Sequence, residues 1–210
     1  MIVTYHGRGF VKIQQGDLVV AFNPVSKKSE AKQTRFGADL ALVSVNHDDY
    51  NGIDQVTLGE RVPFVIDGPG EYEVGGIFIK GLPSTGPNGK INTIYELTFD
   101  DIKIVHTGAL ADSILDSQTQ ESLVDVDVLL LPIGGDDVLD AKVAHKFALE
   151  INPHLVIPLE YDGPEGGKAL ASFLKEAGVS ADKAQPKDKL TFRKKELLNQ
   201  EAEIAVLAVV

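Results

Sequence analysis

Short apolar or alternating runs, separated by turn-forming residues, dominate the chain up to residue 131. Runs of this kind, rich in β-branched and aromatic residues, are typical of β-strands. The pattern predicts strands at 2–5, 10–13, 18–22, 40–43, 64–66, 77–81, 93–99, 102–106 and 126–131. Gln15-Gly16-Asp17 and Asp100-Asp101 are expected to form tight turns between neighbouring strands. The first part of the protein is therefore predicted to be rich in sheet.

Helical spacing of apolar residues appears only later in the chain. It predicts one helix around 143–151 and another around 170–177, where Gly178 suits a left-handed C-terminal cap. Asp112 is placed to cap a third helix over 113–123. Late strands are expected at 155–159, 190–192 and 205–210. The charged stretches 187–189 and 193–196 are interpreted as solvated turns and strand edges.

The composition limits the size and class of the protein. With 210 residues and 43% hydrophobic content, the chain is long enough for a single domain, 1–210, with a sizeable core. The 31 acidic residues outnumber the 20 basic ones, and the resulting net charge of −11 disfavours binding to nucleic acid. There is no cysteine, which excludes disulfides, thiolate metal sites and cysteine nucleophiles. Neither a signal-peptide pattern nor an apolar run of roughly 18 residues is present, so we expect a soluble, cytoplasmic protein with no membrane partner.

A polar cluster follows the predicted buried strand at 40–43. It reads Ser44-Val45-Asn46-His47-Asp48-Asp49-Tyr50, and loops that follow buried strands often carry functional residues. The cluster resembles the metal-binding signature H-x-H-x-D-H, in which imidazoles and a carboxylate converge on one or two zinc ions. The four ligand positions of that signature hold Val45, His47, Asp49 and Tyr50. Val45 has no donor atom, and a neutral phenol is a poor ligand because its pKa is near 10.

Further motifs, in a fixed order along the chain, extend this resemblance. They are Thr4-Tyr5-His6-Gly7, Asn23-Pro24, the stretch 42–52, Asp67-Gly68-Pro69-Gly70-Glu71-Tyr72, His106-Thr107-Gly108, Leu131-Pro132-Ile133-Gly134-Gly135 and Val156-Ile157-Pro158-Leu159-Glu160-Tyr161. Together they resemble the metallo-β-lactamase superfamily, in particular its small bacterial branch of zinc-dependent hydrolases similar to ascorbate-6-phosphate lactonase. The resemblance implies an α/β (α+β) fold, a four-layer αββα sandwich of two mixed sheets with helices outside. It also implies a site at one edge, where the loops at the strand ends meet.

The resemblance implies seven metal ligands, of which this chain offers few. Beyond the first motif, the remaining family ligands fall on Gly86 within Ser84-Thr85-Gly86, on Ala109 and on Glu160. Val45, Tyr50, Gly86 and Ala109 are thus degenerate ligand positions, while His47, Asp49 and Glu160 are the residues able to bind a metal. Ala109 stands where the family has the carboxylate that bridges two ions, and a dinuclear centre is therefore not expected.

Other residues are expected near the rim of the site. Asn23 stands where relatives often place a supporting Asp, and His106 matches a family position with a structural role. Gly134 and Gly135 follow a buried strand and are able to offer backbone amides to a ligand, with Tyr161 on the same rim. Arg8 either presents a cation to an anionic ligand or pairs with a surface acid. The glycine clusters lack the spacing of phosphate-binding loops.

Three functional hypotheses follow from this inventory. The first is a non-catalytic pseudoenzyme that acts by binding a small anionic ligand or a protein partner and needs no cofactor. The second is a metal-dependent hydrolase of a phosphorylated or lactone-like small molecule, with one Zn, Mn or Mg ion on His47, Asp49 and Glu160 and Asp49 as a catalytic residue. The third is a structural subunit of a homo-oligomer. A hydrolase requires the three residues to converge on one point, whereas a pseudoenzyme is expected to fill the empty ligand space with Tyr50 or a neighbour.

Overall fold

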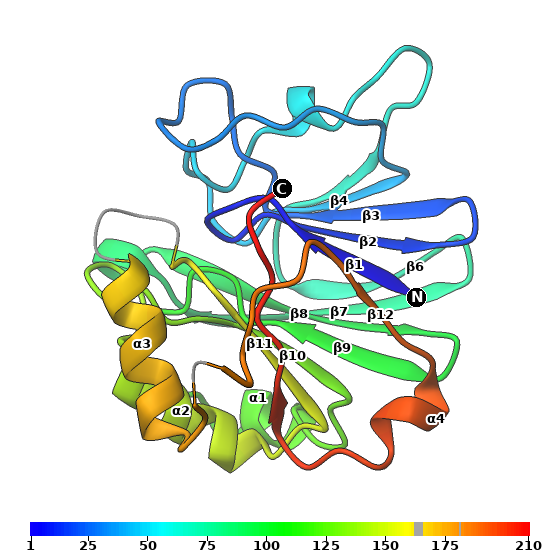
Figure 1. Ribbon diagram of the computed structural model, residues 1–210. Coiled ribbons are helices and arrows are strands. Elements are labelled where there is room, and N and C mark those ends of the chain that lie inside the picture. Colours follow the sequence, from blue (N-terminus) through cyan, green and yellow to red (C-terminus); the bar gives the residue numbers. More distant parts are fainter. Residues whose placement is uncertain (162–165, 181) are drawn as a thin grey trace.

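Two β-sheets pack face to face, with helices on the outside of one of them (Figure 1). The computed structural model describes residues 1–161, 166–180 and 182–210. No helix within these ranges has the length and apolar character needed to cross a membrane.

The smaller sheet contains the opening strands of the chain. Its order is β12 (Leu190–Thr191), β1 (Ile2–Tyr5), β2 (Val11–Gln15), β3 (Leu18–Phe22), β4 (Leu40–Leu42) and β5 (Phe64–Ile66). β12, β1, β2 and β3 pair antiparallel, whereas β3, β4 and β5 run parallel. The parallel part directs the ends of β3 and β4 toward the same edge of the sheet.

The larger sheet is also mixed. Its order is β13 (Glu203–Ile204), β11 (Leu155–Leu159), β10 (Val128–Pro132), β9 (Ile102–His106), β8 (Ile91–Phe99), β7 (Ile77–Thr85) and β6 (Gly70–Val74). β6 to β9 form an antiparallel meander, and β9, β10, β11 and β13 run parallel. The loops that follow β10 and β11 consequently leave the sheet at one edge.

The core between the sheets consists of the inward-facing residues of both. Val3, Phe22 and Leu42 of the smaller sheet and Leu97 and Ile157 of the larger one belong to the same buried cluster. Burial of these side chains removes apolar surface from water, which is the main stabilising term for such a sandwich.

One buried tyrosine adds a polar connection between the sheets. The Tyr95 hydroxyl on β8 lies 2.8 Å from the carbonyl oxygen of Val43 and 3.1 Å from that of Ile66. It therefore satisfies carbonyl groups at the ends of β4 and β5 across the core.

The outer layers of the two sheets differ. α1 (Ser117–Ser122), α2 (Ala141–Ile151) and α3 (Gly166–Glu176) lie outside the larger sheet, where Phe147 and Phe173 pack on Leu129 and Leu131. The smaller sheet is covered by the loops that precede and follow β4, including the 3-10 turn η1 (Ile53–Gln55). Val25 and Val56 from these loops belong to a buried cluster with residues of the sheet. The predicted sandwich of two mixed sheets is confirmed, with loops supplying this outer layer.

Most predicted strands and both long helices occur within a few residues of their expected bounds. Gly178, with φ of 67°, ends α3 as expected, because its N–H and that of Val179 bond back to Lys175 and Leu174.

Three expectations were wrong, and one strand was missed. The helix expected over 113–123 begins only at Ser117, because the carboxylate of Asp116 accepts the Thr119 N–H at 2.9 Å, whereas Asp112 accepts that of Ile114 in a turn. The stretch 193–196 contains the start of α4 (Lys194–Leu197), stabilised by Glu196 bonding back to the Arg193 N–H. β6 was missed, because its Gly and two Glu residues weaken the strand pattern. The terminal strand expected at 205–210 is not formed, because β13 ends at Ile204 and the described residues after it make only isolated bridges, at Leu207 and Val209.

Candidate functional site

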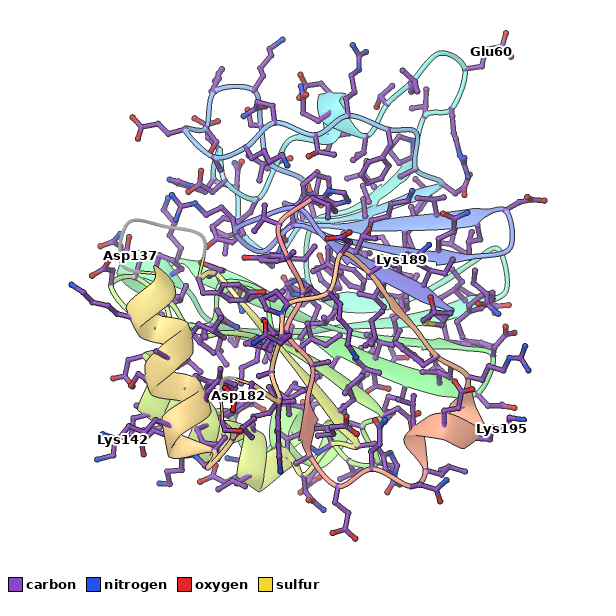
Figure 2. All side chains as sticks on the ribbon, in the orientation of Figure 1. Glu60, Asp137, Lys142, Asp182, Lys189 and Lys195 are labelled. Atoms are coloured by element: carbon purple, nitrogen blue, oxygen red, sulfur yellow. The ribbon has the colours of Figure 1, made fainter. Side chains whose placement is uncertain are left out.

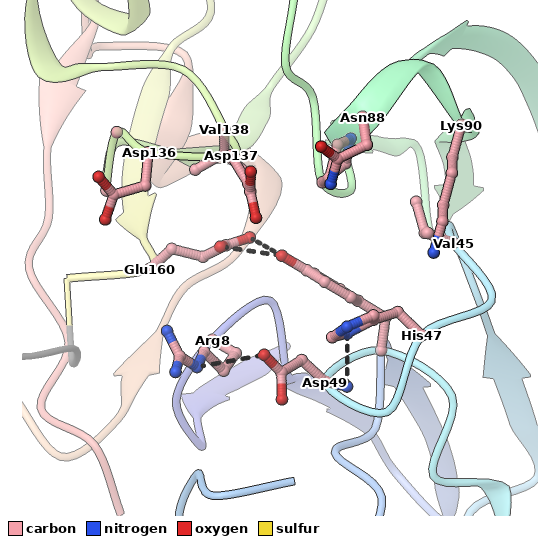
Figure 3. Close-up of a pocket in the computed structure, with 14 residues that line it drawn as sticks. Arg8, Val45, His47, Asp49, Asn88, Lys90, Asp136, Asp137, Val138 and Glu160 are labelled. Atoms are coloured by element: carbon pink, nitrogen blue, oxygen red, sulfur yellow. Dashed lines mark hydrogen bonds and ion pairs between the residues drawn. The ribbon is translucent and has the colours of Figure 1, made fainter.

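A pocket of about 390 Å³ lies at the edge where the loops after β4, β10 and β11 meet the β1–β2 turn and the β7–β8 loop (Figure 3). The β7–β8 loop contains the 3-10 turn η2 (Pro87–Gly89). The pocket is lined by Arg8, Val45, His47, Asp49, Tyr50, Pro87, Asn88, Lys90, Gly134, Gly135, Asp136, Asp137, Val138 and Glu160. His47, Asp49 and Glu160, the residues predicted from sequence, thus line one common pocket.

Tyr50 and Glu160 are bonded to each other across the pocket. The Tyr50 hydroxyl lies 3.0 and 3.1 Å from the two carboxylate oxygens of Glu160 and donates to them. Glu160 has a positive φ of 62°, and its own N–H donates to the hydroxyl of the buried Tyr5 at 2.8 Å. Burial, followed by the negative charge of Glu160, raises the pKa of Tyr50 well above its ordinary value, so the phenol stays protonated and remains a donor.

The space next to this hydrogen bond is apolar. Val45, Tyr50, Ala109 and Val138 form one buried cluster, with Tyr50 only 6% exposed. A Cβ atom placed on Gly86 would lie 3.3 Å from the Cγ2 of Val45, so Gly86 closes against the same cluster. Val45, Tyr50, Gly86 and Ala109, the positions to which the resemblance assigns ligands, thus lie together, and three of them belong to one apolar cluster.

The other two candidate ligands are engaged with protein groups. The Asp49 carboxylate pairs with Arg8, whose Nε lies 3.6 Å from Oδ2, and accepts a hydrogen bond from the Ser29 hydroxyl. The Asp49 N–H donates to Nδ1 of His47 at 3.2 Å, and the His47 side chain is exposed. Arg8 therefore pairs with an acid, which was one of its two predicted roles.

These contacts do not suit a metal centre. Among residues 1–161, 166–180 and 182–210, no group of three or more His, Asp or Glu side chains is placed to hold one metal ion. Asp49 faces a guanidinium and Glu160 faces a phenol, so each carboxylate already has a hydrogen-bonding or charged partner. The arrangement supports hydrogen bonding and ion pairing and does not fit a three-ligand zinc site.

Of the residues expected at the rim, Gly134 and Gly135 line the pocket. A Cβ atom on Gly134 would collide with the backbone oxygen of Glu160, so glycine permits the close approach of these two loops. Asn23 does not line the pocket. It is buried, and its Oδ1 accepts the Ser44 N–H at 2.8 Å, which fixes the start of the polar cluster. Tyr161 is also outside the pocket, and its hydroxyl donates to the Leu207 carbonyl.

His106 is fully buried beneath the site and does not line the pocket. Its Nε2 donates to the Gly9 carbonyl at 2.9 Å, its Nδ1 accepts the Gly108 N–H at 2.9 Å, and its ring stacks on Phe22. Burial lowers the pKa of His106 to about 4, so the ring is neutral in the folded protein. The unfolded state protonates this histidine near its ordinary pKa of 6.5, whereas the folded state does so only near 4. The free energy of unfolding therefore falls as the pH drops from about 6.5 toward 4.

Several lining residues were not identified from the sequence: Asn88, Lys90, Asp136, Asp137 and Val138. Asn88 has a positive φ of 55° in the β7–β8 loop, and Asp136 one of 55° after β10. Exposed residues in such turns follow no hydrophobic periodicity that could identify them. The available signal was their position in the sequence, directly after Gly134-Gly135 or directly before β8.

Comparisons with known proteins agree on the fold. A family model described as "Beta-lactamase superfamily domain" matches residues 2–160. A protein named UPF0173 metal-dependent hydrolase, from Natranaerobius thermophilus, is 24% identical over 77% of this chain and 84% of its own length. The structure of a proposed zinc-dependent hydrolase of the metallo-β-lactamase superfamily from Thermotoga maritima is 24% identical, with a TM-score of 0.78 over 98% of this chain and 97% of that one. A metallo hydrolase from Ignicoccus hospitalis gives 17% identity and a TM-score of 0.67 over 91% and 98%.

Proposed function

Because residues 2–160 match that family model, the chain belongs to the β-lactamase superfamily domain family, and we propose that it is a non-catalytic member that acts by binding. The observation that carries this proposal is the contact made by Tyr50. Its ring fills the apolar space next to Val45 and Ala109, and its hydroxyl bonds to Glu160. The contacts of Tyr50 with Val45, Ala109 and Glu160 thereby join the loops that carry these four positions.

In this proposal, contacts between side chains take the joining role that a shared metal ion has in a metal centre. A metal ion in such a site connects loops from both sheets by binding ligands from each. Here the Tyr50–Glu160 hydrogen bond connects the loop after β4 with the end of β11, and the Arg8–Asp49 pair connects that loop with the β1–β2 turn. The pocket has a volume of about 390 Å³ and polar groups on its walls, which supports ligand binding.

The competing function is a hydrolase with one divalent ion on His47, Asp49 and Glu160. It is favoured by the names of the relatives, which are metal-dependent hydrolases, and by the location of the three residues in one pocket. An assay of phosphoester and lactone hydrolysis with added Zn, Mn or Mg separates the two functions.

We expect no metal-dependent turnover from the native protein, and the same result from His47→Ala and Glu160→Ala. Turnover that depends on added metal and disappears in both variants would establish the hydrolase instead.

Assembly with a second copy or a protein partner is a further proposal. Large apolar side chains on the described surface, including Phe64, Ile91 and Ile114, are 54%, 72% and 79% exposed. Sedimentation velocity over a range of concentrations tests self-association, and a sedimentation coefficient that stays at the monomer value would contradict it.

A further inference from the structure

Charged side chains stand on both sides of the pocket (Figure 3). Glu160, after β11, and Asp137, after β10, direct carboxylates toward one another on one side. Lys90, immediately before β8, lies on the opposite side next to Val45. The carboxylates of Asp137 and Glu160 thus lie across the pocket from the Lys90 ammonium group, and Arg8 lies on the same side as Glu160.

The groups at the two ends are available to a ligand. Within the described residues, the side chains of Asp137 and Lys90 make no hydrogen bond or ion pair, and both are exposed. Arg8, by contrast, is paired with Asp49, so the charges of these two residues offset each other. Among the described residues that line the pocket, Asp137 and Lys90 therefore offer one carboxylate and one ammonium group to a ligand.

The floor between these ends is apolar. The ring of Tyr50 and the side chains of Val45 and Val138 belong to one buried cluster that opens into the pocket. A ligand that crosses from Lys90 to Asp137 would place its middle on this floor. A hydrocarbon segment fits that surface better than a polar one, because a polar group placed there would lose hydrogen bonds to water without gaining a partner on the floor.

We propose that the pocket binds a small zwitterion, an amino carboxylate whose ammonium group meets Asp137 and Glu160, whose carboxylate meets Lys90 and whose hydrocarbon middle covers Tyr50. The inference rests on the proposed binding function and narrows its ligand class. It differs from the small anionic ligand expected from the sequence, because four carboxylates line the pocket against two basic side chains, Arg8 and Lys90. A ligand with negative charge alone would be repelled by the Asp137 and Glu160 wall.

The test uses calorimetric titration of the full chain with 4-aminobutanoate, 6-aminohexanoate, and the single-charge analogues hexanoate and hexylamine, in low salt with EDTA. At least one amino carboxylate is expected to bind about tenfold more tightly than either analogue, because both of its charges find an opposite charge in the pocket. Low salt keeps the screening of these charges weak. Asp137→Asn and Lys90→Gln should each weaken its binding by about fivefold. Glu60→Gln and Lys195→Gln make the same charge changes away from the pocket, as Figure 2 shows for Asp137, Glu60 and Lys195, and should leave binding unchanged.

Failure of all four probes to bind, equal binding of hexanoate or hexylamine, or equal effects of the pocket and control variants would each overturn the inference. Repeating the titrations with zinc in place of EDTA distinguishes this failure from failure of the proposed function. Loss of zwitterion selectivity under both conditions would refute the ligand class alone. Binding that requires zinc and is lost in His47→Ala would contradict the proposed metal-free site as well.

Discussion

Removing a single oxygen atom from the site tests the bond between Tyr50 and Glu160. Tyr50→Phe keeps the ring in its apolar cluster with Val45, Ala109 and Val138 but deletes the hydroxyl that lies 3.0 and 3.1 Å from the Glu160 oxygens. Hydrogen bonds to charged groups contribute about 1.5–3 kcal/mol. Because Glu160 is only half-buried and water can replace part of the bond, we expect a loss of about 1.5 kcal/mol of unfolding free energy.

Urea unfolding and thermal melting measure this loss. For a domain of this size, about 1.5 kcal/mol corresponds to a decrease in Tm of roughly 3–6 °C. Tyr72→Phe is the matched control, because that hydroxyl bonds to neutral backbone carbonyls at 3.2 and 3.3 Å near the surface, and its loss should cost about 0.5 kcal/mol.

A double-mutant cycle with Glu160→Ala isolates the pairwise contribution. The effects of Tyr50→Phe and Glu160→Ala should be non-additive by about 1.5 kcal/mol, since either change alone already removes the bond. Strict additivity of the two, or a Tyr50→Phe variant as stable as the native protein, would refute the view that this bond joins the two loops.

Three further predictions concern the framework around the site. Lowering the pH from about 7.5 to about 5 should reduce the free energy of unfolding by about 2 kcal/mol through protonation of His106 in the unfolded state. Urea unfolding of His106→Asn should show a correspondingly smaller dependence on pH, and an equal dependence in both proteins would contradict this prediction. Lys194→Met removes the ammonium 2.6 and 2.7 Å from the fully buried Asp127 carboxylate and should destabilise by about 2–3 kcal/mol in chemical denaturation; a loss below about 0.5 kcal/mol would argue against a stabilising pair. Gly52→Ala places a methyl group against the backbone of Val25 and should lower the free energy of unfolding by about 3 kcal/mol. Gly68→Ala, with open space around it, should melt within about 2 °C of the native protein. Similar melting temperatures for the two variants would disprove the predicted clash.

The sequence predicted the sheets well because alternation along a strand directly reflects which side chains face the core. Val3 and Tyr5 on β1, or Val11 and Ile13 on β2, are buried at every second position, and such patterns are readable without any partner. α1 was misplaced because two aspartates, Asp112 and Asp116, lie near its start and only the hydrogen bond to Thr119 decides between them.

The site was predictable in part. His47, Asp49 and Glu160 were expected near each other from their motifs, and they line one pocket. Which partner each carboxylate takes depends on loops far apart in the sequence, such as the bond between Tyr50 and Glu160, 110 positions apart. Short-range patterns carry no information on such pairs, which is why the placement of Asp137 across the pocket from Lys90 emerged only from the structure.

The most direct test of the central claim is the metal content of the full chain, purified without chelator and then incubated with zinc or manganese before elemental analysis. We predict substoichiometric metal, unchanged in His47→Ala and Glu160→Ala, because Tyr50 and its apolar neighbours occupy the space where ligands would converge. One equivalent of metal in the native protein, lost in both variants, would contradict the account and establish a metal centre on these residues.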